Sequence, residues 1–411
     1  MQIGVYRQTA NEIMQRQTSH QKEVISLIIL CAYFVISIFE PYINGIIGSI
    51  TKYYIFVIMI VLLLQHRGRL STTRSTIAMI IWILYKFFSL LWSRDYTTPT
   101  MHYISQIGML LFLIVLFSCE YGENIFEGIE ITYWISSGII GLLSLFFSHS
   151  YINQIAARQV LIVAGVETDP NNQAALLFVG ICISLVNIIH KRKRFLVSII
   201  ILLINTYGCF LTGSRAGLVT MVVVSVACIL LPDKKRKAVG SLFGKVLLLL
   251  LFVCAGLFLA RTLDSNIYDR LFTLEDYEDG SGRSLLWANA WKALTANPFS
   301  FFFGLGWGTT TIVGGGDVGI HNTFLSLLCD VGFLGTILFM TPIIIMSWRL
   351  TKQQVYLPVV LLVAQFIPAF FIDAINKRFF WNSIFLLGMY YYHYIAPPTK
   401  TIGGKSKYVR W

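Results

Sequence analysis

Three basic residues stand where each could act on an anionic substrate. Arg215 lies in a short glycine-containing link between two apolar runs, Arg283 follows a Gly-Ser-Gly sequence, and His321 precedes another apolar run. Arginine can hold a phosphate through two parallel hydrogen bonds, and histidine exchanges protons near neutral pH. These residue types predict a site that binds an anion and transfers a proton beside it.

The segments around these residues contain signals for helix starts. Asp169 precedes Pro170 at the beginning of an apolar run, as an N-cap residue precedes a proline in the first turn. Ser281 or Gly282 can cap a second helix whose first residue is Arg283. Because the free N–H groups of a helix N-terminus attract anions, the start of this second helix is a candidate anion site.

The second helix should run from Arg283 to the Asn297-Pro298 pair, where proline ends it. Arg283, Trp287 and Trp291 are spaced four residues apart, so they share one face of the helix. Tryptophan favours the membrane interface. We therefore expect this helix to lie on the membrane with Arg283 at headgroup depth. The two tryptophans either seat the loop or stack on a sugar, and the sequence leaves both roles open.

Each of these residues also has a purely structural interpretation. Arg215 can be a snorkelling arginine in a tight hairpin, Asp169 an N-cap only, and His321 a structural histidine. The segment from Asp373 to Arg378 adds cations and can be an exposed turn. The functional interpretation rests on their common location, because the topology below places all of them at one membrane boundary.

The elements that must position these residues are membrane helices. The 411-residue chain is 56% hydrophobic and 13% charged, against about 25% charged in an ordinary globular domain. A spanning helix needs about 20 mostly apolar residues. The fold class is therefore an all-α membrane protein, a single polytopic domain over residues 1–411. About twelve helices are predicted, near residues 24–40, 48–65, 76–92, 101–119, 132–149, 173–190, 194–211, 216–232, 244–262, 322–348, 353–372 and 379–396.

The positions of lysine and arginine predict the orientation. With a cytoplasmic N-terminus, inside segments carry about twice as many of these residues as outside segments, as the positive-inside rule requires. Both termini are then cytoplasmic and the candidate site is extracytoplasmic. Lys86 falls in the middle of a predicted helix, and Glu120 to Glu130 form a cytoplasmic loop. Topology explains most of the net charge of +12, so no nucleic-acid partner is implied.

One extracytoplasmic loop, residues 263–321, contains no spanning run. Loops of this length tend to be functional, and we expect short interfacial helices within it. Two glycine-rich segments, residues 304–308 and 314–316, predict irregular and closely packed backbone beneath the helix that follows His321.

The chain resembles the O-antigen ligase and O-antigen polymerase superfamily of bacterial surface polysaccharide assembly. The resemblance covers most of the chain and includes Asp169-Pro170-Asn171 at the family's relative position. It is sharpest in residues 212–218, 281–287, 297–298, 304–308, 321–325 and 330–335. It implies a GT-C-like enzyme that transfers a glycan with inversion, without a metal or other cofactor, at the outer face of the bacterial cytoplasmic (inner) membrane.

Within the mechanism that the resemblance implies, the chemistry of individual residues suggests their roles. Arg215 and Arg283 would hold the donor's diphosphate and stabilise the charge that it gains, and His321 would accept the proton of the attacking hydroxyl. The candidate substrate-binding residues are Asp169, Asn171, Ser214, Ser281, Trp287, Trp291, Asn322 and Arg378. No metal ligand is among them.

The implied donor is a polyprenyl-diphosphate-linked glycan in the lipid bilayer, and the acceptor decides the reaction. A polymerase extends another lipid-linked repeat unit, whereas a ligase glycosylates lipid A core. We favour the polymerase because nothing in the sequence indicates a lipid A core acceptor. A chain-length regulator protein is a candidate partner. A lipid-linked glycan transporter is the less favoured alternative, since transporters carry ionisable groups deep in the membrane and the charged residues here crowd one face.

Overall fold

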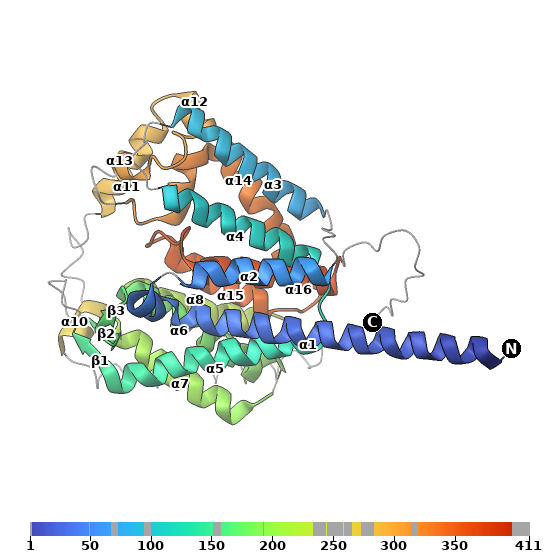
Figure 1. The fold of residues 1–411 in the computed structure, drawn as a ribbon. Helices are drawn as coiled ribbons and strands as arrows, with labels where there is room; N and C mark the ends of the chain where they lie inside the picture. The colour runs from blue at the N-terminus through green and yellow to red at the C-terminus, as the bar shows by residue number, and fades with distance from the viewer. Residues whose placement is uncertain are drawn as a thin grey trace.

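The structure is a computed structural model, and the chain folds into a bundle of helices (Figure 1). It describes residues 2–48, 50–66, 73–93, 100–150, 158–191, 193–232, 265–272, 283–313 and 319–396, together with the single residues 244 and 258. The helix predicted at 244–262 and the segments 273–282 and 314–318 of the large loop therefore lie outside the described residues.

Helices dominate the described part of the chain. The helices that precede the large loop are α1 (Gln2–Ile47), α2 (Ile50–Gln65), α3 (Arg74–Phe88), α4 (Thr100–Ser118), α5 (Glu123–Phe147), α6 (Pro170–Val186), α7 (Phe195–Leu211) and α8 (Arg215–Leu230). A 3-10 turn (Ser89–Trp92) extends α3, and a π-helical turn (Asn187–Lys191) extends α6. The later helices are α10 (Ser265–Phe272), α11 (Arg283–Leu294), α12 (Pro298–Phe303), α13 (Thr310–Val313), α14 (Thr323–Lys352), α15 (Leu357–Ala369) and α16 (Arg378–Tyr394).

Among the described residues, five helical segments are long and apolar enough to cross a membrane: Gln21–Ile47, Arg74–Trp92, Glu123–Phe147, Pro170–His190 and Thr323–Lys352. Shorter apolar helices pack beside them. Leu64, Leu196 and Leu230 are more than two-thirds exposed on helix surfaces, which suits contact with lipid rather than water. The expectation of a helical, multi-pass membrane protein is thus confirmed, whereas the number of twelve spans stays a prediction.

Helix α6 lies at the centre of one half of the bundle. It contacts α5, α7, α8 and α15, and its residues are buried on every face. Gln365 of α15 donates a hydrogen bond to the Ala175 carbonyl, and Ser137 of α5 donates one to the Leu176 carbonyl. A helix that is apolar all round must be enclosed by others. The N-terminus of α6 is therefore held in a fixed place.

The α5–α6 connection contains a small antiparallel sheet that the sequence did not predict. Its strands are β1 (Ser148–Ser150), β2 (Gln159–Val163) and β3 (Val166–Glu167), in the order β1-β2-β3, with Ser148 opposite Leu161 and Ile162 opposite Glu167. Ala164 and Gly165, both with positive φ, form the two-residue turn between β2 and β3. The sheet leads directly into the start of α6.

One sequence-based placement is wrong. Residues 123–130 are not loop, because α5 begins at Glu123 and runs without interruption to Phe147. The error arises because acidic residues were taken as loop, although the bundle buries Glu130. Lys86 lies inside the apolar segment Arg74–Trp92 as predicted, in the last turn of α3 before the 3-10 turn.

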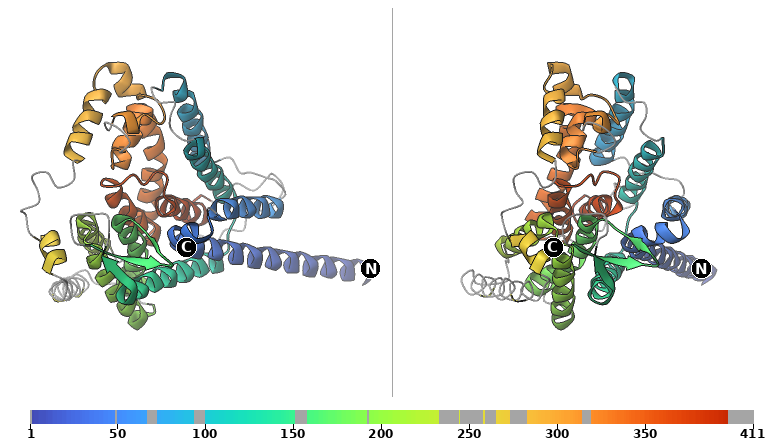
Figure 2. Two further views of the ribbon diagram at one scale, coloured as in Figure 1. Left: turned by 60° about the vertical axis from the view of Figure 1, so that its left-hand side comes forward. Right: turned by 90° about the vertical axis from the view of Figure 1, so that its left-hand side faces the viewer.

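The short helices of the large loop gather at one end of the bundle. Figure 1 shows α10, the sheet and α11 to α13 at this end, while the N-terminal part of α1 extends from the opposite end. In both views of Figure 2, α14 stands between α3 and the pair α11–α12. We call this end of the bundle the loop end.

Candidate functional site

The N-terminus of α6 carries the first predicted residues. Asp169 is the N-cap, and its Oδ1 accepts hydrogen bonds from the N–H groups of Asn171 at 2.9 Å and Asn172 at 3.2 Å. Pro170 occupies the first turn. The N-cap prediction is confirmed. The helix start fixes the Asp169 carboxylate, and the carboxylate compensates the positive end of the helix dipole.

The α7–α8 hairpin lies against this helix start. Ser214 caps α8 by accepting a hydrogen bond from the Gly217 N–H, and its hydroxyl donates to Asn171 Oδ1 at 2.8 Å. Gly213 has a φ of 57°, a conformation that favours glycine in the tight turn. The structure therefore joins Ser214 and Asn171, two residues that lie far apart in the sequence.

Arg215 fastens the hairpin to the large loop. Its Nε donates to the carbonyl of Arg270 in α10 at 2.8 Å, and the Arg270 Nε donates to the Gly213 carbonyl at 3.1 Å. This reciprocal pair brings two guanidinium groups to the same place. Sequence reasoning missed Arg270, although its position in a short helix with one apolar face could have suggested it.

Arg283, His321 and Asp169 come together from three separate segments. Arg283 begins α11 as predicted and is half-buried, while His321 is exposed just before α14. Burial lowers the pKa of the Arg283 guanidinium, and the Asp169 charge opposes this. Partial burial and the Arg283 charge lower the pKa of His321, whereas Asp373 and Asp169 oppose this. The net lowering favours the neutral imidazole near pH 7, the form that a general base requires.

Asp373, in the α15–α16 connection, is the acidic member of this group that the sequence did not single out. Thr323 binds the same connection, since its N–H and hydroxyl both donate to the Ile372 carbonyl and its oxygen accepts from the Ala374 N–H. One oxygen of Asp373 is buried without a hydrogen-bond partner in the part of the chain that the structure describes. The start of α14 and Asp373 are thereby held beside His321.

Arg378 does not join this cluster. It is 4% exposed, and its Nε donates to the Glu40 carboxylate of α1. Its predicted substrate contact stays untested, but most of its surface is enclosed by protein. The sequence alone could not show that Arg378 is buried in an ion pair rather than exposed. Its partner Glu40 lies more than 300 residues away in the sequence.

The remaining predicted residues support the helix starts. Asn322 caps α14 by accepting hydrogen bonds from the N–H groups of Phe324 and Leu325. Trp287 Nε1 donates to the Ile320 carbonyl at 3.0 Å, one residue before His321, whereas Trp291 is 50% exposed. Trp287 therefore seats the loop. Ser281 lies outside the described residues.

His321 itself has a strained backbone. Its φ of 52° lies in the left-handed region, which costs energy for a residue with a side chain. The Trp287 hydrogen bond on one side and the Asn322 cap on the other hold this conformation. Such strain is found where surrounding structure fixes a side chain for a task.

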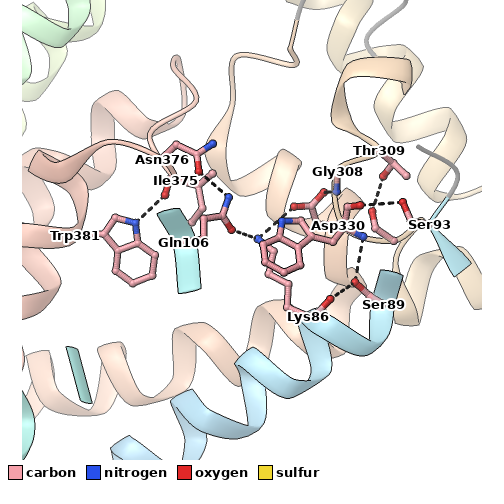
Figure 3. Close-up of polar contacts among 12 residues, drawn as sticks. Lys86, Ser89, Ser93, Gln106, Gly308, Thr309, Asp330, Ile375, Asn376 and Trp381 are labelled. Carbon is pink, nitrogen blue, oxygen red and sulfur yellow. Dashed lines mark hydrogen bonds and ion pairs between the residues drawn. The ribbon is translucent and has the colours of Figure 1, made fainter. Parts of the chain in front are cut away.

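A buried polar network ties the loop to the bundle (Figure 3). Lys86 of α3 lies 3.4 Å from the Asp330 carboxylate of α14 and donates to Gln106 Oε1 at 2.6 Å. Gln106 Nε2 donates to Asn376 Oδ1 at 2.7 Å, and the Gly308 N–H donates to Asp330 Oδ1 at 3.1 Å. Lys86 also lies over the Trp307 ring, 4.7 Å from its centroid. The network thus connects α3, α4, α14, the glycine-rich loop and the Asp373 connection.

The predicted close packing of the glycine-rich segment is confirmed. Gly304, Gly306 and Gly308 all have positive φ, and a Cβ atom on Gly304 would lie 2.6 Å from the Gly332 nitrogen. Gly332 kinks α14, with a φ of 67°. The two backbones therefore touch, and only glycine fits at this crossing.

One comparison with known proteins covers the segment that carries the three basic residues. A family model described as O-antigen ligase matches residues 199–340. That segment contains Arg215, Arg283 and His321, together with the contact between Gly304 and Gly332. No curated protein matches the chain. Over this segment the chain is similar to the O-antigen ligase family, in agreement with the resemblance found in the sequence motifs.

Proposed function

We propose that this protein polymerises polyprenyl-diphosphate-linked oligosaccharide repeat units into a surface polysaccharide. The transfer is inverting and metal-independent, and it takes place at the extracytoplasmic face of the inner membrane. The observation that carries the proposal is the position of His321, a histidine with a lowered pKa beside the Arg283 guanidinium. A base next to a cation suits a reaction that deprotonates a hydroxyl while a diphosphate leaves.

The chemical step balances with the groups at the loop end. The acceptor hydroxyl attacks the anomeric carbon of the donor glycan and gives its proton to the neutral imidazole of His321. A new glycosidic C–O bond forms while the C–O bond to the diphosphate breaks. The diphosphate leaves with the bonding electrons and gains negative charge. Arg283 stabilises that charge, the task of a preorganised cation.

Arg215 supports the same step from the α7–α8 hairpin. Its Nε is engaged by the Arg270 carbonyl, so the guanidinium has a fixed orientation. A fixed planar guanidinium can bind a phosphate without losing much side-chain freedom. Arg215 and Arg270 together form a cationic wall beside Ser214 and Asn171, and we assign the donor diphosphate to the space between this wall and Arg283.

The acceptor separates the two activities of the superfamily. A ligase would transfer the glycan to lipid A core or another acceptor, and the same three basic residues would serve it equally well. The described part of the chain shows no feature specific to a lipid A core acceptor, which leaves the polymerase as our proposal. A transporter is less favoured, because the buried charged pair of Lys86 and Asp330 is held in a hydrogen-bonded network.

The test is the glycan profile of a deletion strain complemented with variants. Loss of the protein should leave single repeat units attached to their acceptor, and Arg283→Ala or His321→Ala should fail to restore long chains. Arg194→Ala and His149→Ala are matched controls, because both residues are exposed and lie outside the cluster. Long chains that persist on the polyprenyl carrier without reaching lipid A core would replace the polymerase with the ligase. Normal polymer from a well-expressed His321→Ala variant would remove the general base.

A further inference from the structure

A polar cavity of about 270 Å³ lies beside the candidate site. Its walls come from α1, α2, α4, the start of α6 and the start of α16. The polar side chains that line it are Ser37, Glu40, Asn44, Lys52, Ser105, Thr168, Asn172, Asn376, Lys377 and Arg378. The function proposed above assigns no role to this cavity.

Two segments that line the cavity also carry acidic members of the cluster around His321. Thr168 and Asn172 line the cavity and lie on either side of Asp169 in the sequence, whose charge acts on Arg283 and His321. Asn376 also lines the cavity and follows Asp373 by three residues. The cavity therefore shares the start of α6 and the α15–α16 connection with the cluster.

The start of α6 separates this cavity from the arginine-bearing hairpin. Asn171 is turned toward the hairpin, where its Oδ1 accepts from Ser214. Asn172 lies about 100° further around the helix and lines the cavity. The loop end therefore offers two compartments on different sides of one helix N-terminus, a cationic one beside Arg215 and a mainly amide- and hydroxyl-lined one beside Asn172.

The lining of the cavity suits a sugar better than a phosphate. Three asparagines and three hydroxyl side chains supply hydrogen-bond donors and acceptors, and Met109, Leu176 and Phe379 supply apolar surface for a sugar ring. Glu40 and Arg378 neutralise each other in an ion pair. The other two charged lining residues, Lys52 and Lys377, are exposed.

We propose that this cavity binds the acceptor saccharide and directs its attacking hydroxyl to His321. The proposal rests on the proposed glycosyl transfer and adds the place of the second substrate. The donor diphosphate occupies the arginine side of the α6 N-terminus, and the acceptor sugar occupies the Asn172 side. The two substrates then approach His321 and Arg283 from different directions, as inversion at the anomeric carbon requires.

The experiment measures donor and acceptor separately with the purified full-length protein. The donor probe is the polyprenyl-diphosphate-linked repeat unit of the source strain, and the acceptor probe is the same repeat unit linked to a short prenyl diphosphate. Asn172→Phe and Ser105→Phe fill the cavity from two walls, and Asn172→Ala removes one amide with little change in packing. Thr341→Phe is the matched control, because Thr341 lies on an exposed face of α14.

Both filling variants should raise the acceptor KM by about tenfold or more, while the affinity for the donor probe stays unchanged. Asn172→Ala should raise the acceptor KM less, and Thr341→Phe should change neither quantity. The proposal would be overturned if the acceptor KM stayed unchanged in a folded Asn172→Ala variant and in both filling variants. It would also be overturned if these variants lost as much affinity for the donor as for the acceptor. A wild-type protein that transfers no sugar between the two probes would instead refute the proposed function.

Discussion

Replacement of Lys86 by methionine should destabilise the protein and disable the site from a distance. Methionine keeps the apolar stem that packs among Trp82 and Trp307, but it removes the charge. Asp330 would then be a buried carboxylate that has lost its counter-charge and keeps the hydrogen bond from the Gly308 N–H. Gln106 would lose the donor that now fixes its orientation toward Asn376.

The magnitude follows from the burial of the pair. The side chains of Lys86 and Asp330 are 1% and 9% exposed. Removing one partner of a buried ion pair costs about 3–5 kcal/mol, because the other charge stays in a poorly solvating environment. Replacing both charges by neutral groups of similar shape costs far less. The Lys86→Met/Asp330→Asn double variant keeps an acceptor for Gly308 and should recover most of the lost stability.

Two measurements follow this perturbation. Thermal unfolding in detergent should show a Tm that falls by several degrees in Lys86→Met and returns toward wild type in the double variant. Polymer formation should fall with it, since the network connects the glycine-rich loop to the Asp373 connection beside His321. Lys292→Met on the exposed surface of α11 is the matched control. A single variant with the Tm and polymer yield of wild type would refute the reasoning.

Three further outcomes follow from the site. Asp373→Asn removes a charge that raises the pKa of His321. The acidic limb of the pH–rate profile should therefore move to lower pH, by about one unit or less. A shift of this limb to higher pH would contradict the assignment. Trp287→Phe removes the hydrogen bond to the Ile320 carbonyl and should cost about 1 kcal/mol of stability, which a lower Tm would show. Its kcat should fall more than the kcat of Trp291→Phe. Asp169→Asn keeps the helix cap, because asparagine caps as well as aspartate. It should lower the donor KM, since it removes a carboxylate beside Arg283. A higher donor KM in this variant would show instead that the carboxylate contacts substrate.

The helix starts were predictable because their signals are local. Asp169 with Pro170, and Arg283 before a helical pattern, each need only a few neighbouring residues to be recognised. The glycine positions were predictable for the same reason, since positive φ restricts the residue type. Asparagine in front of a helix is likewise a local signal, and Asn322 is used as a cap.

The contacts between distant segments were not predictable. Arg270 binds the α7–α8 hairpin although more than 50 residues of sequence separate the two. Lys86, in an early helix, pairs with Asp330 in α14, far along the sequence. In both cases the chemistry depends on which helices pack together, and an apolar helix pattern does not specify its neighbours. Asp373 was overlooked for this reason, because the adjacent Lys377 and Arg378 made the segment look like an exposed cationic turn.

The position of Asp169 bears on the diphosphate site that we propose. Its carboxylate interacts electrostatically with both Arg283 and His321, and it offsets the charge of Arg283 when no substrate is bound. A diphosphate carries more negative charge than one carboxylate, so it can replace the Asp169 carboxylate as the main counter-charge of Arg283. Because the N–H groups of Asn171 and Asn172 already bind Asp169, the carboxylate stays at the helix start when the donor arrives. Burial already desolvates Arg283 in part before the proposed diphosphate binds, so the charge that develops on the leaving group would meet a cation that needs little further desolvation.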